Sequence, residues 1–335
     1  MVMDRARLVA SLPNGPQHPR AGTPPRRPGS VRRTTAIEQR WDDFGQPQDV
    51  VASGRDLRTA LDGTATVVDR ARVDLWVAGD GTVASVEVDP AHPALDGLVG
   101  SPTRSGFRAA AAALVPEHRD EATVLHQLLD DVPLAALIAS YGLTREHPEW
   151  NIPLETAQRL TDLCSGWAAG ATMLDALETT GIFPIPVGPI APPLTDADDP
   201  LAWHELEVMT PRTVRRVRRL DLATDPAGGP LALEVYFRDS HLGLDGVEDV
   251  LHEYTVDATV DPASLVVLSS TAVAHTLPWP ECPGALTSAG RIVGHPVADL
   301  PALVGDTFTG TSTCSHLNDL LRSIAGVASM AAALR

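Results

Sequence analysis

Two β-rich regions with period-two alternation are the feature that most constrains the fold of this chain. In each region, four runs of alternating apolar and polar residues are separated by turn sequences such as DGT and GDG. The runs span residues 32–41, 50–61, 64–79 and 82–90 in the first region and 213–224, 230–241, 248–260 and 264–275 in the second. Such alternation is typical of strands with one buried face, and short connections favour antiparallel pairing. The sequence therefore predicts two antiparallel β meanders.

Each predicted meander is followed by a similar series of elements. A Leu-Val-Gly or Ile-Val-Gly turn comes next, at Leu98–Gly100 and at Ile292–Gly294, and then a helix that begins near a histidine, His126 or His316. Corresponding elements in the same order indicate an internal repeat. In this alignment Val124 takes the place of Cys314. The first copy therefore lacks that thiol.

We therefore expect an α+β fold: two tandem antiparallel β-meander-plus-helix units with an inserted helical segment. The units span residues 31–150 and 205–335, and the helical insertion with its proline-rich linker spans residues 151–204. Residues 1–30 are rich in Pro, Gly and Arg and show no periodicity, so we predict a disordered leader.

The charge and composition exclude several classes of function. The formal net charge is −17, which argues against binding to nucleic acid or to anionic membranes. All 26 basic residues are arginine, so a Schiff-base lysine and a P-loop lysine are both ruled out. Three cysteines are too few for a secreted disulfide scaffold, and no apolar run is long enough to span a membrane. We expect a cytoplasmic protein.

The most distinctive chemical feature is Cys314 next to His316, in the sequence TSTCSHLNDLL. Polar and small residues precede an amphipathic run, which predicts a helix that begins at or just after Cys314. Free N–H groups and the helix dipole favour a thiolate at such a position. Cys314 and His316 are therefore candidate catalytic residues.

Cys282 could join the same site. The following proline suits a first helical position, which would place Cys282 at a second helix start. Cys282, Cys314 and His316 could then bind zinc or iron, although the spacing is not that of a zinc finger. Two alternatives stay open: both cysteines could be buried as small apolar residues, or they could form a thiol–disulfide switch or supply a nucleophile.

His252 alternates with Tyr254, Val256 and Ala258 on the more apolar face of its predicted strand. A buried histidine that is hydrogen-bonded to a carbonyl is one interpretation, and a metal ligand or a general base beside Cys314 is the other. Arg216 and Arg218 belong to an arginine-rich run in an acidic protein. They could bind an anionic substrate, or they could form cross-strand ion pairs with carboxylates such as Asp239.

The second half of the chain resembles the bacterial domain of unknown function 2889 family. The residues that carry the resemblance are HEYTVDATVDP (252–262), the Cys-Pro segment ECPGA (281–285), the turn RIVG (291–294) and TSTCSHLNDLLRS (311–323). Residues 32–57 resemble the N-terminal part of longer, actinobacterial-looking members. The resemblance implies membership and, at most, a context of small-molecule metabolism.

These observations lead to two functional hypotheses. The first is a metal- or thiol-dependent enzyme that acts on a small, anionic organic metabolite at a site in the second repeat. The second is a non-catalytic accessory protein that binds a small ligand or a metal. Zinc or iron is the candidate cofactor, and a small molecule is the expected partner.

Overall fold

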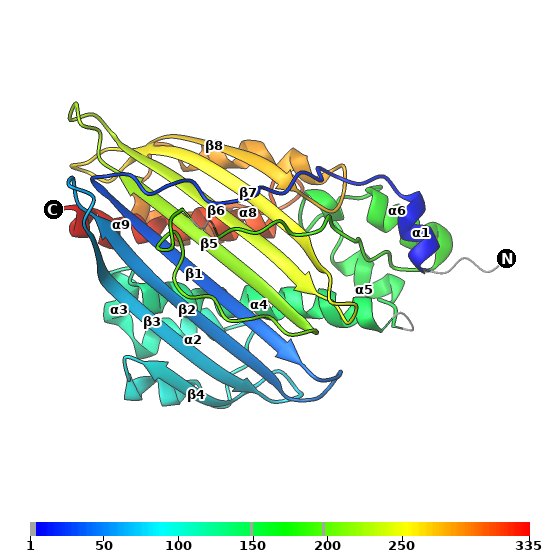
Figure 1. The fold of residues 1–335 in the computed structure, drawn as a ribbon. Helices are drawn as coiled ribbons and strands as arrows, with labels where there is room; N and C mark the ends of the chain where they lie inside the picture. The colour runs from blue at the N-terminus through cyan, green and yellow to red at the C-terminus, as the bar shows by residue number, and fades with distance from the viewer. Residues whose placement is uncertain (1–4, 148–149, 196–197) are drawn as a thin grey trace.

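The protein, described by a computed structural model, is built on one antiparallel sheet of eight strands in the order β4-β3-β2-β1-β5-β6-β7-β8 (Figure 1). The structure describes residues 5–147, 150–195 and 198–335. The strands are β1 (Ser30–Trp41), β2 (Gln48–Thr59), β3 (Ala65–Val77), β4 (Val83–Asp89), β5 (Thr213–Ala223), β6 (Leu231–Leu242), β7 (Glu248–Val260) and β8 (Val267–Thr276). Both predicted meanders are confirmed, and they join edge to edge through antiparallel pairing of β1 with β5.

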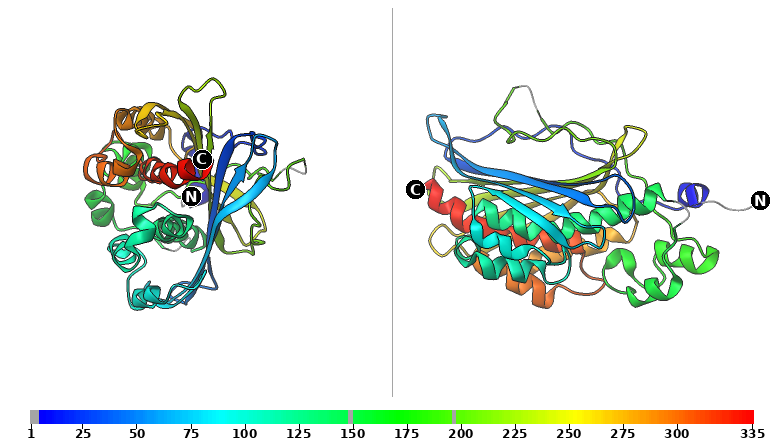
Figure 2. Two further views of the ribbon diagram at one scale, coloured as in Figure 1. Left: turned by 90° about the vertical axis from the view of Figure 1, so that its left-hand side faces the viewer. Right: turned by 90° about the horizontal axis from the view of Figure 1, so that it is seen from below.

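Helices cover one face of this sheet, and the edge-on view in Figure 2 shows the two layers. The first half contributes η1 (Pro93–Leu98), α2 (Phe107–Leu114), α3 (Pro116–Asp120) and α4 (Val124–Glu146). The second half contributes η3 (Cys282–Ile292), η4 (Val297–Asp299), α7 (Leu300–Thr307), α8 (Ser315–Ser323), η5 (Ile324–Gly326) and α9 (Val327–Leu334). The α+β class is confirmed. No helix in the described ranges is both long and apolar enough to cross a membrane.

The main core of the second half lies between its meander and its helices. Alternate residues of β6 and β7, such as Phe237 and Val256, are buried against Leu317 and Leu320 of α8. Leucines recur along α8 at helical spacing, so one stripe of the helix faces the sheet. This packing fixes where α8 begins relative to β6 and β7, and therefore positions Cys314 and His316.

The two meanders correspond residue by residue. Arg33 pairs with Asp56 across β1 and β2, and Arg216 pairs with Asp239 across β5 and β6, a shift of 183 positions in each case (33 to 216, 56 to 239). The register irregularities of β2–β3 and β6–β7, at Asp56/Leu57 and Asp239/Ser240, obey the same shift. The two meanders therefore share one strand order and one register, while the duplication itself stays a prediction.

The prediction of a disordered leader is wrong for residues 5–29. Helix α1 (Arg5–Ser11) buries Leu8, and the following segment runs along the end of the sheet and over the face that the helices leave uncovered (Figures 1 and 2). His18 N donates to His275 O at 2.8 Å, and Leu277 N donates to Pro16 O at 2.9 Å. The composition suggested disorder because the segment buries little apolar surface by itself. Its order comes from hydrogen bonds to the strands and loops of the second half. Residues 1–4 lie outside the described residues.

The inserted segment has two parts. Helix α5 (Leu154–Arg159), η2 (Ser165–Trp167) and α6 (Thr172–Thr180) form a small group at one end of the sheet (Figure 1). The proline-rich linker then crosses the uncovered face of the sheet, where Trp203 is buried against Ala36 and Tyr236. The linker and the leader thus partly cover that face.

Candidate functional site

Cys314 occupies the N-cap position of α8, as predicted, with extended backbone angles of φ −137° and ψ 130°. Its sulfur faces the backbone N–H groups of His316 and Leu317. These groups would stabilise a thiolate, but burial dominates and raises the pKa of the Cys314 thiol. The resting group is therefore a neutral thiol at the open N-terminus of a helix.

His316 connects this thiol to a buried carboxylate. The Cys314 sulfur lies 4.0 Å from His316 Nδ1, and His316 Nε2 lies 3.7 Å from Asp239 Oδ2. Burial, assisted by the charge of Arg216, lowers the pKa of His316 to about 3, so the imidazole is neutral at pH 7. A neutral imidazole has a lone pair for the thiol proton, but the lowered pKa makes His316 a weak base, and the imidazolium formed would depend on the nearby Asp239 carboxylate. Thiol, imidazole and carboxylate therefore stand in the order that nucleophilic catalysis uses.

His252 completes the cluster from β7. Its ring stacks on that of His316, with centroids 3.6 Å apart and an angle of 14° between the planes. Burial, assisted by His316, lowers the pKa of His252 well below its usual value. His252 Nδ1 is buried and has no hydrogen-bond partner among the described residues. The predicted apolar face is confirmed, and it faces the helices. The alternative interpretation is a core histidine with a hydrogen bond to a carbonyl, and among the residues that the structure describes that hydrogen bond is not present at Nδ1.

Arg216 and Arg218 are fully buried under α8. Arg216 donates from Nε and Nη2 to the two oxygens of Asp239, at 2.7 and 2.8 Å, and also pairs with Asp319. Arg218 pairs with Asp131 and Asp319, each at 2.7 Å. Both guanidinium groups are thus bound to buried carboxylates. This is the ion-pair alternative, and it corrects the interpretation of Arg216 and Arg218 as substrate-binding residues.

The three cysteines gather near Tyr254. The Tyr254 hydroxyl faces the Cys314 sulfur, and the charges of Cys282 and Cys164 would also act on it. Burial, with the nearby Cys314, raises the pKa of Cys164 to about 11 and that of Cys282 further. All three thiols are free, so no disulfide joins them. Cys282 is the first residue of η3 rather than its cap.

The predicted metal ligand set does not assemble. In the second half, the described ligand atoms that lie within 4.8 Å of one another belong to Asp239, His252 and His316, without Cys282 or Cys314. In a tetrahedral zinc site both metal–nitrogen bonds lie in the ring planes, which places two imidazole centroids about 5 Å apart. The stacked rings are closer than that and nearly parallel. One ring would have to turn before both could bind one ion.

The first half contains a counterpart of this site with different chemistry. The shift of 183 positions maps His252 onto Asp69, since Asp56 pairs with Asp69 as Asp239 pairs with His252. Asp69 Oδ2 accepts from Val124 N at 2.9 Å and so closes the N-terminus of α4. Val124 takes the place of Cys314 in our alignment. At α8, a histidine and a thiol therefore replace a capping carboxylate and a valine.

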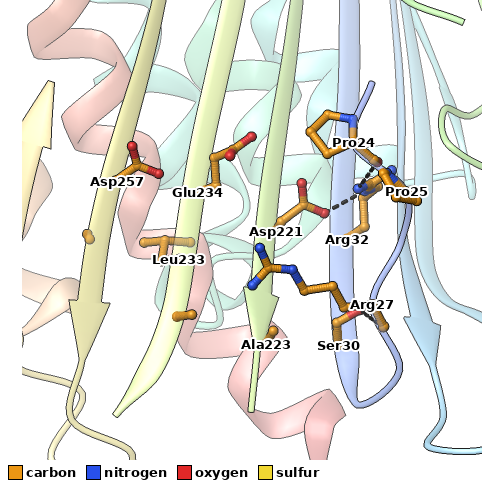
Figure 3. Close-up of a pocket in the computed structure, with 12 residues that line it drawn as sticks. Pro24, Pro25, Arg27, Ser30, Arg32, Asp221, Ala223, Leu233, Glu234 and Asp257 are labelled. Atoms are coloured by element: carbon orange, nitrogen blue, oxygen red, sulfur yellow. Dashed lines mark hydrogen bonds and ion pairs between the residues drawn. The ribbon is translucent and has the colours of Figure 1, made fainter. Parts of the chain in front are cut away.

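Two hollows in the described part of the chain differ in their relation to the site. A cavity of about 40 Å³ is lined by His252 together with Tyr141, Gly188 and Pro278, and it has room for one or two water molecules. A larger hollow of about 160 Å³ lies on the opposite face of the sheet, where Asp221, Glu234 and Asp257 stand in front of the strands and the helices lie behind (Figure 3). None of the candidate site residues lines the second hollow.

Sequence reasoning missed Asp239 as a site residue and predicted it only as an ion-pair partner for the arginines. A signal was available, because Leu231, Leu233, Val235 and Phe237 precede it on one strand face. A single carboxylate that ends an apolar face needs a buried partner, and here it contacts Arg216 and His316.

The comparison with known families bears on this half of the chain. Residues 214–330 match the family described as "Protein of unknown function (DUF2889)". This match confirms the resemblance over the matched range. That range contains all the residues of the candidate site, from Asp239 on β6 to His316 on α8. The matched range does not include residues 32–57, so their resemblance stays a prediction. No curated protein and no solved structure matches the chain.

Proposed function

We propose that the chain is a thiol-dependent enzyme in which Cys314 is the nucleophile, His316 the general base and Asp239 the residue that orients His316. The observation that carries this proposal is the sequence of contacts from the Cys314 sulfur to His316 Nδ1 and from His316 Nε2 to Asp239. Both separations are longer than hydrogen bonds. Catalytic contacts are often long without substrate and tighten when it binds.

The chemistry suited to this arrangement is transfer of an acyl group. The Cys314 thiol gives its proton to His316 Nδ1 while the sulfur bonds to the acyl carbon. The leaving group then departs with that proton, and water or another acceptor releases the acyl group from sulfur. The open N-terminus of α8 supplies N–H groups for the negative charge that develops on the acyl oxygen.

The substrate in this proposal is a small organic acyl compound, and an anionic one suits the positive end of α8. The cavity lined by His252 adjoins the site, and its volume of about 40 Å³ requires neighbouring side chains to move when substrate enters. Three free thiols favour a reducing, cytoplasmic location, and the net charge of −17 argues against nucleic acid as a partner.

The first half supports the assignment by contrast. We infer that the two halves arose by duplication and that only the second kept reactive groups. The shared register supports the duplication, and Asp69 and Val124 at the positions of His252 and Cys314 support the difference in chemistry.

A non-catalytic metal-binding role for Asp239, His252 and His316 is the second candidate. The closeness of their ligand atoms favours it, and the stacked rings oppose it.

The reactivity of Cys314 tests the proposed base. Mass spectrometry would follow alkylation of each cysteine by chloroacetamide in the wild type and in His316→Gln. If His316 takes the proton of the thiol, the substitution should slow alkylation of Cys314 at pH 7.5 by at least about tenfold. Incubation with a panel of acyl thioesters should then leave an acyl adduct on Cys314 in the wild type and none in Cys314→Ser.

Cys164 supplies the internal control. It lies near Cys314, and its hydrogen-bonding contacts among the described residues are the backbone groups of Gly166 and Trp167 rather than a histidine, so its alkylation rate should be the same in both proteins. Equal rates at Cys314 with and without His316 would remove the general base from the proposal. Circular dichroism before the reaction checks that each variant is folded.

A further inference from the structure

A second group of metal-binding side chains lies in the first half, on the surface. His92 stands at the start of η1, in the loop after β4, and Glu117 and His118 lie on α3. One ligand atom from each of the three residues lies within 4.8 Å of the others. We propose that His92, Glu117 and His118 bind a divalent transition metal ion of the zinc type.

The two imidazole rings already stand as two ligands of one ion would. Their centroids are 5.4 Å apart and their planes make an angle of 72°. With a zinc–nitrogen bond of about 2.0–2.1 Å and tetrahedral angles, the centroids of two histidine ligands lie about 5 Å apart. The stacked rings of His252 and His316 fail this test. The geometry therefore points to the first half for the metal, whereas the sequence pointed to the second.

The carboxylate is placed to complete the set. Glu117 Oε1 lies 3.0 Å from His92 Nε2, close to the separation of two ligand atoms on one small ion. Two histidines and one glutamate are a donor set that zinc accepts. The Glu117 side chain is 54 % exposed and that of His92 is 26 % exposed. An ion can therefore reach the group from solvent, and a water molecule can fill the fourth position.

One further contact indicates a prepared site. His118 Nδ1 lies 2.9 Å from the hydroxyl of Thr123, and that hydroxyl also accepts from His126 N as the N-cap of α4. This contact holds the orientation of the His118 ring, as the hydrogen bonds behind metal ligands commonly do. His92 Nδ1 is buried and has no hydrogen-bond partner among the described residues. His92 Nε2 is the atom that faces Glu117, so the ion would bind at Nε2 and leave Nδ1 to bond a water molecule.

Titration calorimetry with Zn²⁺ tests the proposal, on the full chain without an affinity tag and after treatment with a chelator. One ion should bind per chain. His92→Ala and His118→Ala should each weaken binding by at least about 100-fold, since losing even an orienting partner commonly costs 10–100-fold. The matched control is His295→Ala, a half-buried histidine of the second half outside both clusters, and it should bind Zn²⁺ as the wild type does.

Co²⁺ in place of Zn²⁺ identifies the ligands by absorption. A site of two histidines and a glutamate should give the visible bands of tetrahedral cobalt without a thiolate-to-cobalt charge-transfer band. Absence of binding would overturn the proposal. So would binding that survives His92→Ala but is lost in Cys314→Ser or His252→Ala. The alkylation of Cys314 is measured without metal, so either proposal can fail while the other stands.

Discussion

The histidines of the buried site are neutral in the folded protein, and this couples its stability to pH. The pKa of His316 falls from an ordinary value near 6.5 to about 3, because burial disfavours the imidazolium. The unfolded chain therefore binds more protons than the folded chain between these two values. The stabilisation is fully present above about pH 6.5 and is lost as the pH falls toward 3.

The free energy of unfolding, measured with urea at pH 7, 6 and 5, should show this loss. A histidine whose pKa is lowered in this way reduces the free energy of unfolding by about 1.4 kcal/mol for each pH unit below 6.5. His316 therefore accounts for a loss of about 2 kcal/mol by pH 5. In His316→Gln the decline should be smaller by that amount. Asp131 acts in the opposite sense, since burial raises its pKa to about 6, but it is present in both proteins and cancels in the comparison. Equal declines would mean that His316 is protonated in the fold.

Single residues also show what the sequence could predict of the site. Cys314 and His316 were predictable because local order places them at a helix start, and His252 because strand alternation places it on the apolar face. Whether these elements meet depends on packing between β7 and α8, which no local pattern encodes. The metal set with Cys282 failed for this reason, because its sulfur packs against Gly166 of the inserted segment.

Among the elements, α4 packs against the rings of Trp41 and His241 on the sheet through Gly142. A Cβ atom on Gly142 would lie 2.5 Å from the Trp41 ring and 3.0 Å from the His241 ring. Glycine inside a helix usually costs stability relative to alanine, but here the rings leave no space for a methyl group. Gly142→Ala should therefore lower the free energy of unfolding by about 1–3 kcal/mol, as overpacking does.

Gly305 in α7 is the matched control for that prediction. Its nearest neighbour would be Arg322 Nη1 at 3.7 Å, an ordinary contact. Gly305→Ala should therefore stabilise the protein by about 0.4–1 kcal/mol. Urea denaturation of the three proteins measures both effects. A stabilising Gly142→Ala would mean that α4 can move away from β1 at little cost.

The strands themselves were predictable because alternation and turn sequences are local signals, and all eight are present. Their arrangement in one sheet was not. The pairing of β1 with β5 brings Thr35 opposite Arg218, although β2, β3, β4, several helices and the linker lie between them in the chain. Two separate meanders would satisfy the same local patterns. The common sheet instead places the buried arginines of β5 between the halves, where Arg218 contacts Asp131 of α4 and Asp319 of α8.

At the scale of the whole molecule, segments that have no core of their own are held in place by distant parts of the chain. The leader is the clearest example. Gln17 forms a β-bridge with Thr276, Arg20 N donates to Glu253, and Arg26 forms an ion pair with Asp199 of the linker at 2.9 Å. The composition of the segment could not reveal this order, because its partners belong to distant parts of the chain.

Deletion of residues 1–29 tests how much the leader contributes to stability. The deletion removes several backbone hydrogen bonds to the loop after β8, each worth about 0.5–1.5 kcal/mol net, and uncovers Trp203, whose indole N–H donates to Thr23. A loss of about 2–4 kcal/mol should lower the melting temperature by roughly 3–6 °C in a chain of this size. Thr23→Val in the full chain is the companion variant, since it removes only the acceptor of Trp203 and should cost about 1–3 kcal/mol. An unchanged melting temperature after the deletion would show that the leader lies on the sheet without stabilising it, because the conformational entropy lost on ordering the segment would then offset the free energy of its hydrogen bonds.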